Sequence, residues 1–115
     1  GRQRIQFLRE SAMSFTLSIW PEPGSRVTME SLALGCPCVV TASGCLPHYI
    51  TDGFNGAIVE RDPDSIYDGY RRVLEAGQQM RWDARRSAGK FNIKSTVSEI
   101  EGLFQRVMDG ERWMI

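Results

Sequence analysis

The fold of this chain is decided by residues 22–40, which read Glu22-Pro23-Gly24-Ser25-Arg26-Val27-Thr28-Met29-Glu30, then Ser31-Leu32-Ala33-Leu34-Gly35, then Cys36-Pro37-Cys38-Val39-Val40. Ser25 is a favoured helix N-cap, and Gly35 is a favoured helix end. The short apolar run at 37–41 predicts a strand. The segment therefore predicts a turn, a helix and a strand, with Glu22 before the helix and Glu30 in its first turn.

Apolar periodicity extends this order in both directions. Before Glu22, residues 4–13 have helical spacing, and a strand carrying Phe15, Leu17 and Ile19 is closed by Pro21. After residue 41 we expect a helical turn at 46–50, a strand at 57–59, and helices at 62–77, 79–89 and 95–108. The last helix is expected to turn inward the side chains Val97, Ile100, Phe104 and Val107 or Met108. Strands that alternate with helices, followed by helices alone, predict an α/β layer with a helical C-terminal tail.

Composition limits the classes of function. The 115 residues suit one domain, spanning 1–115, and 14 Lys and Arg balance 14 Asp and Glu, which disfavours nucleic acid as a partner. The three cysteines are an odd number and favour reduced thiols. No apolar run reaches the ~20 residues that span a bilayer, so we expect a soluble, cytoplasmic protein. About three strands are thin for a parallel sheet, where about five are usual, so we expect the domain to be partial.

Residues 7–104 resemble the C-terminal nucleotide-sugar-binding domain of retaining GT-B glycosyltransferases, particularly family 4. The resemblance depends on an ordered set of motifs rather than on one short pattern. The set comprises an apolar strand closed by Pro21, the pair Glu22 and Glu30 seven residues apart, the run 30–40, Gly44-Cys45-Leu46-Pro47, Asp52-Gly53-Phe54-Asn55-Gly56-Ala57-Ile58-Val59 and Phe91-Asn92-Ile93. It implies a partial Rossmann-like parallel sheet.

The resemblance also implies roles for the residues around the first turn. Glu22 corresponds to the carboxylate that hydrogen-bonds the donor sugar near the reacting centre, and is the catalytic candidate. Glu30 corresponds to the carboxylate that binds the two ribose hydroxyls. The turn Gly24, Ser25, Arg26 and Val27 corresponds to the segment that meets the donor diphosphate. These residue types suit the task, because a carboxylate accepts from a vicinal diol and helix N-terminal amides attract phosphate.

As the resemblance implies, the chain is the donor-binding part of a hexosyltransferase-type enzyme of carbohydrate biosynthesis. The enzyme would transfer sugar from a nucleoside diphosphate sugar, with retention, to a glycan, lipid or small-molecule acceptor. No metal or other cofactor is expected, and the partner is an N-terminal domain of the same protein, without which the chain is expected to be inactive. Peripheral attachment to the cytoplasmic membrane face is a further expectation.

Two short segments depart from the family pattern. Gly24-Ser25 stands where the family usually has Phe-Gly, and His48 stands where it usually has Glu. The basic residues that neutralise the donor diphosphate in the family precede the matched segment. This chain alone is therefore expected to bind a nucleotide sugar weakly.

Other interpretations of the same residues remain open. Glu22 and Glu30 could be a solvated turn residue and a helix-terminus charge. Cys36, Cys38, Cys45 and His48 have the ligand count of a zinc site that would staple a non-catalytic regulatory or assembly module, although Cys36 and Cys38 are closer together than zinc ligands usually are. The arginines of the penultimate helix indicate a solvated face, with phosphate or anionic lipid as the alternative contact; they are Arg81, Arg85 and Arg86.

Overall fold

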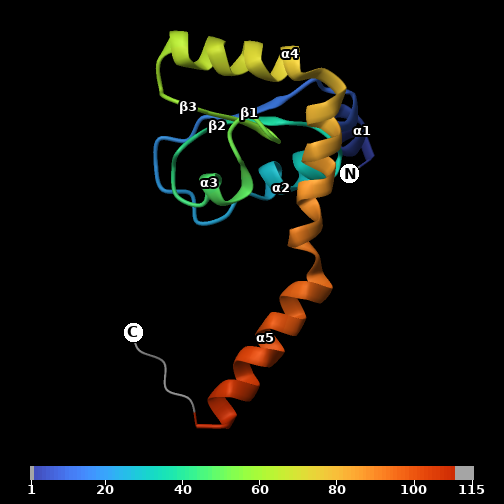
Figure 1. Cartoon of the computed structure of the whole chain (residues 1–115), viewed down its shortest axis with the longest axis vertical. Coiled ribbons are helices and arrows are strands. Elements are labelled where there is room, and N and C mark those ends of the chain that lie inside the picture. Colours follow the sequence, from blue (N-terminus) through green and yellow to red (C-terminus); the bar gives the residue numbers. More distant parts are fainter. Residues whose placement is uncertain (1, 111–115) are drawn as a thin grey trace.

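Three short parallel strands form the sheet of the computed structural model, which describes residues 2–110 (Figure 1). The strands β1 (Ser14–Thr16), β2 (Cys38–Thr41) and β3 (Gly56–Val59) lie side by side in that order. Val39 of β2 pairs with Phe15 on one side and Ala57 on the other. All four residues of β2 are buried, as expected for a parallel strand covered on both faces.

Helices cover both faces of this sheet. In chain order they are α1 (Arg2–Glu10), α2 (Arg26–Ala33), α3 (Leu46–Tyr49), α4 (Pro63–Ser87), the 3-10 turn η1 (Ala88–Phe91) and α5 (Ile93–Met108). Figure 1 shows α2 and α3 on one side of the strands and the first half of α4 on the other. At Gly77 the backbone leaves helical geometry, with φ 61° and ψ −140°, which confirms the predicted end of the first helical segment. The second segment follows at once, so α4 bends from one face of the sheet towards the other.

Alternate residues of β2 supply the two halves of the core. Val40 packs with Leu32, Leu46 and Ala84 on the α2 side, whereas Val39 packs in a second cluster with Ala57, Val59, Val73 and Met80 under α4. The predicted α/β fold, a parallel sheet with a helical C-terminal tail, is confirmed.

The first strand is shorter than the sequence predicts. It ends at Thr16 instead of continuing through Ile19. Beyond Thr16, side-chain hydrogen bonds take the place of the backbone hydrogen bonds that would continue the pairing with β2. The carbonyl oxygen of Ser18 accepts hydrogen bonds from Thr41 Oγ1 and Ser43 Oγ, each at 2.8 Å. Ile19 is consequently 70% exposed, outside any strand.

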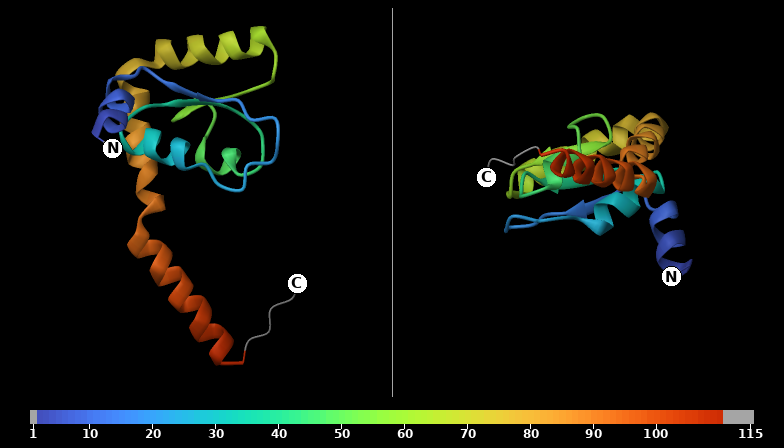
Figure 2. Two further views of the ribbon diagram at one scale, coloured as in Figure 1. Left: turned by 180° about the vertical axis from the view of Figure 1, so that it is seen from behind. Right: turned by 90° about the horizontal axis from the view of Figure 1, so that it is seen from below.

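The expected inward face of the last helix is wrong for the part of the chain that the structure describes. Every residue of α5 is exposed, and Phe104 is exposed by 64%. Figure 2 shows α5 running away from the sheet, so no described element covers its apolar stripe. The periodicity identified the helix correctly, but a stripe is buried only where another element packs against it.

The predicted single domain, 1–115, extends past the described residues at both ends. None of the helices described within residues 2–110 is both long enough and apolar enough to cross a bilayer.

Candidate functional site

Ser25 caps the N-terminus of α2 and thereby leaves two backbone amides free. Its side chain is buried, and Ser25 Oγ accepts the Thr28 backbone N–H at 3.3 Å. Burial raises the pKa of the nearby Tyr49 phenol, and the Ser25 backbone amide opposes that rise. Arg26 and Val27 are the first two residues of the helix, so no helical carbonyl lies four residues before them to accept from their amides. They are therefore available to an anion in front of α2.

Glu22 lies half-buried in the loop before α2, with its carboxylate held on one side. Ser18 Oγ donates to Glu22 Oε1 at 2.6 Å, and the indole Nε1 of Trp20 donates to the same oxygen at 3.2 Å. No hydrogen bond within residues 2–110 reaches Oε2. The carboxylate is thus oriented by two neighbours while one oxygen remains able to accept a ligand hydroxyl.

The loops that follow β1 and β2 are tied together at Glu22. The Cys45 backbone N–H donates to the Glu22 carbonyl oxygen at 2.7 Å, and the Ser43 hydroxyl reaches the carbonyl of Ser18. Because both loops leave the carboxyl ends of parallel strands, they meet at the edge where α/β sheets bind ligands.

Glu30 lies at the start of the second turn of α2, just past the first turn that was predicted. The helix begins at Arg26, so Glu30 is its fifth residue and is about 6 Å along the axis from the first. Glu30 Oε1 accepts from Arg26 Nε at 3.1 Å and from Arg4 Nη2 at 3.2 Å. The predicted position in the first turn is therefore wrong, because the fifth residue after the Ser25 cap belongs to the second turn.

A groove of about 320 Å³ passes beside Glu30. It lies among α2, α4's end and η1, and its lining residues are Arg26, Met29, Glu30, Ala33, Ala88 and Phe91. Its volume falls within the ~300–1,000 Å³ of small-molecule pockets. Glu30 therefore sits at a groove wall, half-buried, rather than on an open helix face.

Polar side chains, not apolar ones, form much of the contact between α2 and the sheet. The helical spacing of Met29, Leu32 and Ala33 predicts that these three face inward. Leu32 is buried, but Met29 is only partly buried and Ala33 is exposed. Thr28 and Ser31 are buried instead. Ser14 Oγ lies 3.2 Å from both Ser31 Oγ and Cys38 Sγ. These bonds hold α2 against β1 and β2, next to the loop that carries Glu22.

Burial raises the pKa of the Cys38 thiol to about 11, against the lowering effect of the Ser14 hydrogen bond. The unfolded thiol ionises near 9, so between pH 9 and 11 the folded state holds one more proton than the unfolded state. Stability then falls as pH rises through this range, by about 2–3 kcal/mol, and is unchanged below it.

We expect Cys38→Ala to remove this part of the alkaline loss of stability. The measurement is the free energy of unfolding by urea at pH 8, 9, 10 and 11. Val39→Ala is the matched control, because it also shortens a buried β2 side chain but removes no titrating group. Equal alkaline losses in Cys38→Ala and Val39→Ala would show that Cys38 does not carry the effect.

Comparison with known proteins assigns the whole arrangement to a family. The sequence pattern of the family described as "Glycosyl transferases group 1" matches residues 2–91. This chain belongs to that family. Among curated relatives, the D-inositol 3-phosphate glycosyltransferase of Geodermatophilus obscurus is 32% identical over 100 residues. That alignment covers 84% of this chain but only 22% of the relative.

Solved glycosyltransferase structures have the same fold as this group 1 chain. AviGT4, a glycosyltransferase involved in avilamycin A biosynthesis, is 29% identical with a TM-score of 0.76, and the match covers 99% of this chain and 35% of AviGT4. Anabaena Alr3699/HepE, solved in complex with UDP, is 19% identical with a TM-score of 0.78, covering 87% of this chain and 29% of that one. The chain therefore corresponds to about a third or less of these relatives.

The zinc interpretation does not fit the structure of this glycosyl transferase chain. Cys36 and Cys38 are buried, whereas His48 is exposed. Among residues 2–110, no group of three or more His, Cys, Asp or Glu side chains is arranged to hold a metal ion. The four candidate ligands are thus not brought together. His48 instead offers its backbone carbonyl to Lys90 Nζ at 2.8 Å.

Three residues that the sequence did not single out support the site. Ser18 and Trp20 orient Glu22, and the Tyr49 phenol lies near the Ser25 amide, which lowers the phenol pKa against the effect of burial. Ser18 was detectable as a polar residue near the carboxyl end of a strand, where ligand sites of parallel sheets gather. Nothing in the sequence pairs Tyr49 with Ser25, because that contact depends on how α3 packs.

Proposed function

We propose that this chain forms the donor-binding part of a retaining glycosyltransferase, which transfers a sugar from a nucleoside diphosphate donor to an acceptor. The observation that carries the proposal is the pre-oriented carboxylate of Glu22, with one oxygen unengaged, in the loop that leads into the free amides of α2. A sugar hydroxyl and a diphosphate are the two chemistries that such a pair of features binds.

Each candidate residue has a role that its surroundings support. Glu22 Oε2 accepts from the donor sugar, and the Arg26 and Val27 amides, which Gly24 leaves unobstructed, donate to the diphosphate. Fixed donors of this kind stabilise the negative charge that develops on the leaving nucleoside diphosphate. Ser25 acts through its cap, which holds those amides in place. This contribution is made by backbone and side chains and uses no metal ion.

Glu30 is assigned to the ribose. Its second oxygen is free of the two arginines, and the adjoining groove has room for part of a nucleoside. Arg4 and Arg26 orient the carboxylate through their contacts to Oε1, as a charge-assisted contact to a diol requires. Arg26 also places a positive charge near the proposed diphosphate position.

The relatives support the class of donor. The Anabaena protein with this fold was solved both with UDP and with UDP-glucose, and the Geodermatophilus relative is named for transfer to an inositol phosphate. We infer a nucleoside diphosphate sugar for this chain, and a glycan, lipid or small molecule as acceptor. An N-terminal domain of the same protein would form the part of the site that binds the acceptor. The nucleotide sugar would come from the cytoplasm.

The test uses the full-length protein that carries this sequence. It is titrated with nucleoside diphosphate sugars, then incubated with one that binds and with candidate acceptors, and the anomeric configuration of the product is read by NMR coupling constants. We expect saturable donor binding and a product of unchanged configuration. Inversion would overturn the retaining assignment. Failure of every nucleoside diphosphate sugar to bind would overturn the donor role and favour the non-catalytic module.

A further inference from the structure

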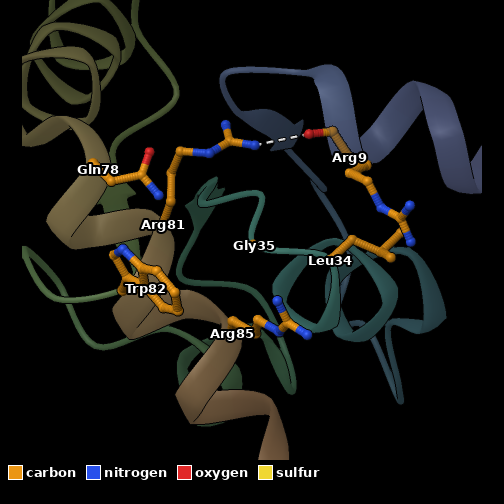
Figure 3. A pocket seen from close by; sticks show the side chains of 7 residues that line it. All are labelled: Arg9, Leu34, Gly35, Gln78, Arg81, Trp82 and Arg85. Carbon is orange, nitrogen blue, oxygen red and sulfur yellow. Dashed lines mark hydrogen bonds between the residues drawn. The ribbon is translucent and has the colours of Figure 1, made fainter.

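A cleft lined by arginines lies at the opposite end of α2 from the free amides. Figure 3 shows Arg9 reaching it from α1, Leu34 from the end of α2, and Gln78, Arg81, Trp82 and Arg85 from the second half of α4. Its volume is about 190 Å³. The length of α2 separates it from the proposed donor position by about 12 Å, so it is a different site.

Arg81 has a structural role in this cleft. Its Nη1 donates to the Ser11 carbonyl oxygen at 2.6 Å and its Nη2 donates to the Arg9 carbonyl oxygen at 2.8 Å, the bond drawn in Figure 3. These carbonyls belong to the end of α1, which has no further helical amide to pair with them. Arg81 thus joins α1 to α4 and fixes the cleft wall.

Arg9 and Arg85 have no such explanation. Within residues 2–110 neither guanidinium forms an ion pair or a hydrogen bond, and no Asp or Glu lines the cleft. An adjoining cleft of about 350 Å³ is also lined by Arg9 and Arg85, together with Ala33 and Leu34, and again without an acid. Since the chain has zero net charge, this is a local excess of positive charge.

The negative end of the α2 dipole accounts for part of this charge. A cation near a helix C-terminus is favourable, and Leu34 and Gly35 follow the last turn of α2. The effect of the helix dipole is screened by solvent and confined to the last turn. It can account for one nearby arginine, but not for three arginines that line the same cleft. Like charges that line one cleft are stabilised when an anion enters.

We propose that this cleft binds a phosphate group, either as inorganic phosphate or as the monoester headgroup of a lipid. Guanidinium forks of Arg9 and Arg85 match phosphate oxygens geometrically. The Gln78 amide supplies a neutral donor, and the Trp82 ring forms an apolar wall. The volume lies below the ~300 Å³ at which small-molecule pockets begin, which suits one phosphate group rather than a nucleotide sugar. The proposal does not depend on the donor site.

The experiment titrates the full-length protein with inorganic phosphate, balanced with chloride to constant ionic strength. The readout is the indole N–H resonance of Trp82, assigned by its loss in Trp82→Phe. We expect a saturable shift, and dissociation constants at least about tenfold weaker in Arg9→Gln and in Arg85→Gln, because each loses a charge-assisted contact. Arg86→Gln is the matched control, since Arg86 is the next residue of α4 and lines neither cleft.

Two further arms identify the location and the source. Arg26→Gln, at the start of α2, is expected to leave the Trp82 shift unchanged. Flotation with phosphatidylcholine vesicles, with and without phosphatidic acid, separates a lipid headgroup from free phosphate. Vesicle binding that requires both phosphatidic acid and Arg85 assigns the lipid headgroup. A Trp82 shift with inorganic phosphate, without vesicle binding, assigns the soluble ion. The proposal is overturned if no saturable shift occurs, if Arg86→Gln weakens binding as much as Arg85→Gln, or if Arg26→Gln abolishes the shift.

Discussion

Gly44→Ala is expected to lower the free energy of unfolding by about 2–5 kcal/mol, and to weaken donor binding in the protein that remains folded. Gly44 has a φ of +55°, and a Cβ atom there would overlap the backbone nitrogen and carbonyl oxygen of Glu22. The left-handed backbone costs an alanine about 1–2 kcal/mol, and forced overlap typically adds about 1–3 kcal/mol. Because backbone cannot rotate aside as a side chain does, the Glu22 loop must move.

Gly53→Ala separates the two contributions to this effect. Gly53 also has a positive φ, of +82°, but nothing lies within 4 Å of an added Cβ. We expect it to cost only the conformational term, about 1–2 kcal/mol, and to leave donor affinity unchanged. Urea unfolding measures the first quantity and calorimetric titration with a nucleoside diphosphate sugar the second. Equal losses in both variants would mean that the Gly44 loop does not press against Glu22.

Local signals in the sequence predicted the elements that depend on local chemistry. Ser25 caps its helix as expected, Asp62 caps the helix that was predicted to begin there, and Gly77 interrupts α4 where a helix end was predicted. Each of these depends on a cap or a backbone preference that is complete within a few residues. The family motifs likewise lie in one continuous stretch, so the match to glycosyl transferases was visible before the structure was known.

Features that depend on distant residues were not predictable in this way. The extent of β1 is set by side chains of Thr41 and Ser43, more than twenty residues away. The arginine cleft joins Arg9 to Arg81, 72 positions apart, so the sequence left open whether the α4 arginines form a solvated face or contact phosphate, and did not bring in Arg9. Ser18 and Trp20 both donate to the first oxygen of Glu22, and no hydrogen bond from residues 2–110 reaches the second. Hydrogen-bond geometry of this kind has no periodic signal in a sequence.

Glu22→Ala and Glu30→Ala, each made in the full-length protein, are expected to reduce kcat/KM by about tenfold to 150-fold. A hydrogen bond to a charged group is worth about 1.5–3 kcal/mol, which converts to that range. Glu22→Ala removes contacts near the reacting centre and should act mainly on kcat. Glu30→Ala removes contacts to the ribose, a part of the donor that does not react, and should act mainly on KM. Steady-state kinetics with varied donor concentration separates the two.

The structure supplies controls that isolate the ligand contact from the protein's own bonds. Arg71 pairs with Glu75 on α4 at the same i,i+4 spacing as Arg26 with Glu30. Glu75→Ala therefore removes an equivalent ion pair, worth about 0.3–0.5 kcal/mol, and should leave kcat/KM unchanged. Ser18→Ala keeps the Glu22 carboxylate but loses its shorter orienting bond, so its loss of kcat should fall between wild type and Glu22→Ala. If both glutamate variants retain full turnover and donor affinity, the carboxylates only stabilise their loops and the proposed donor site is wrong.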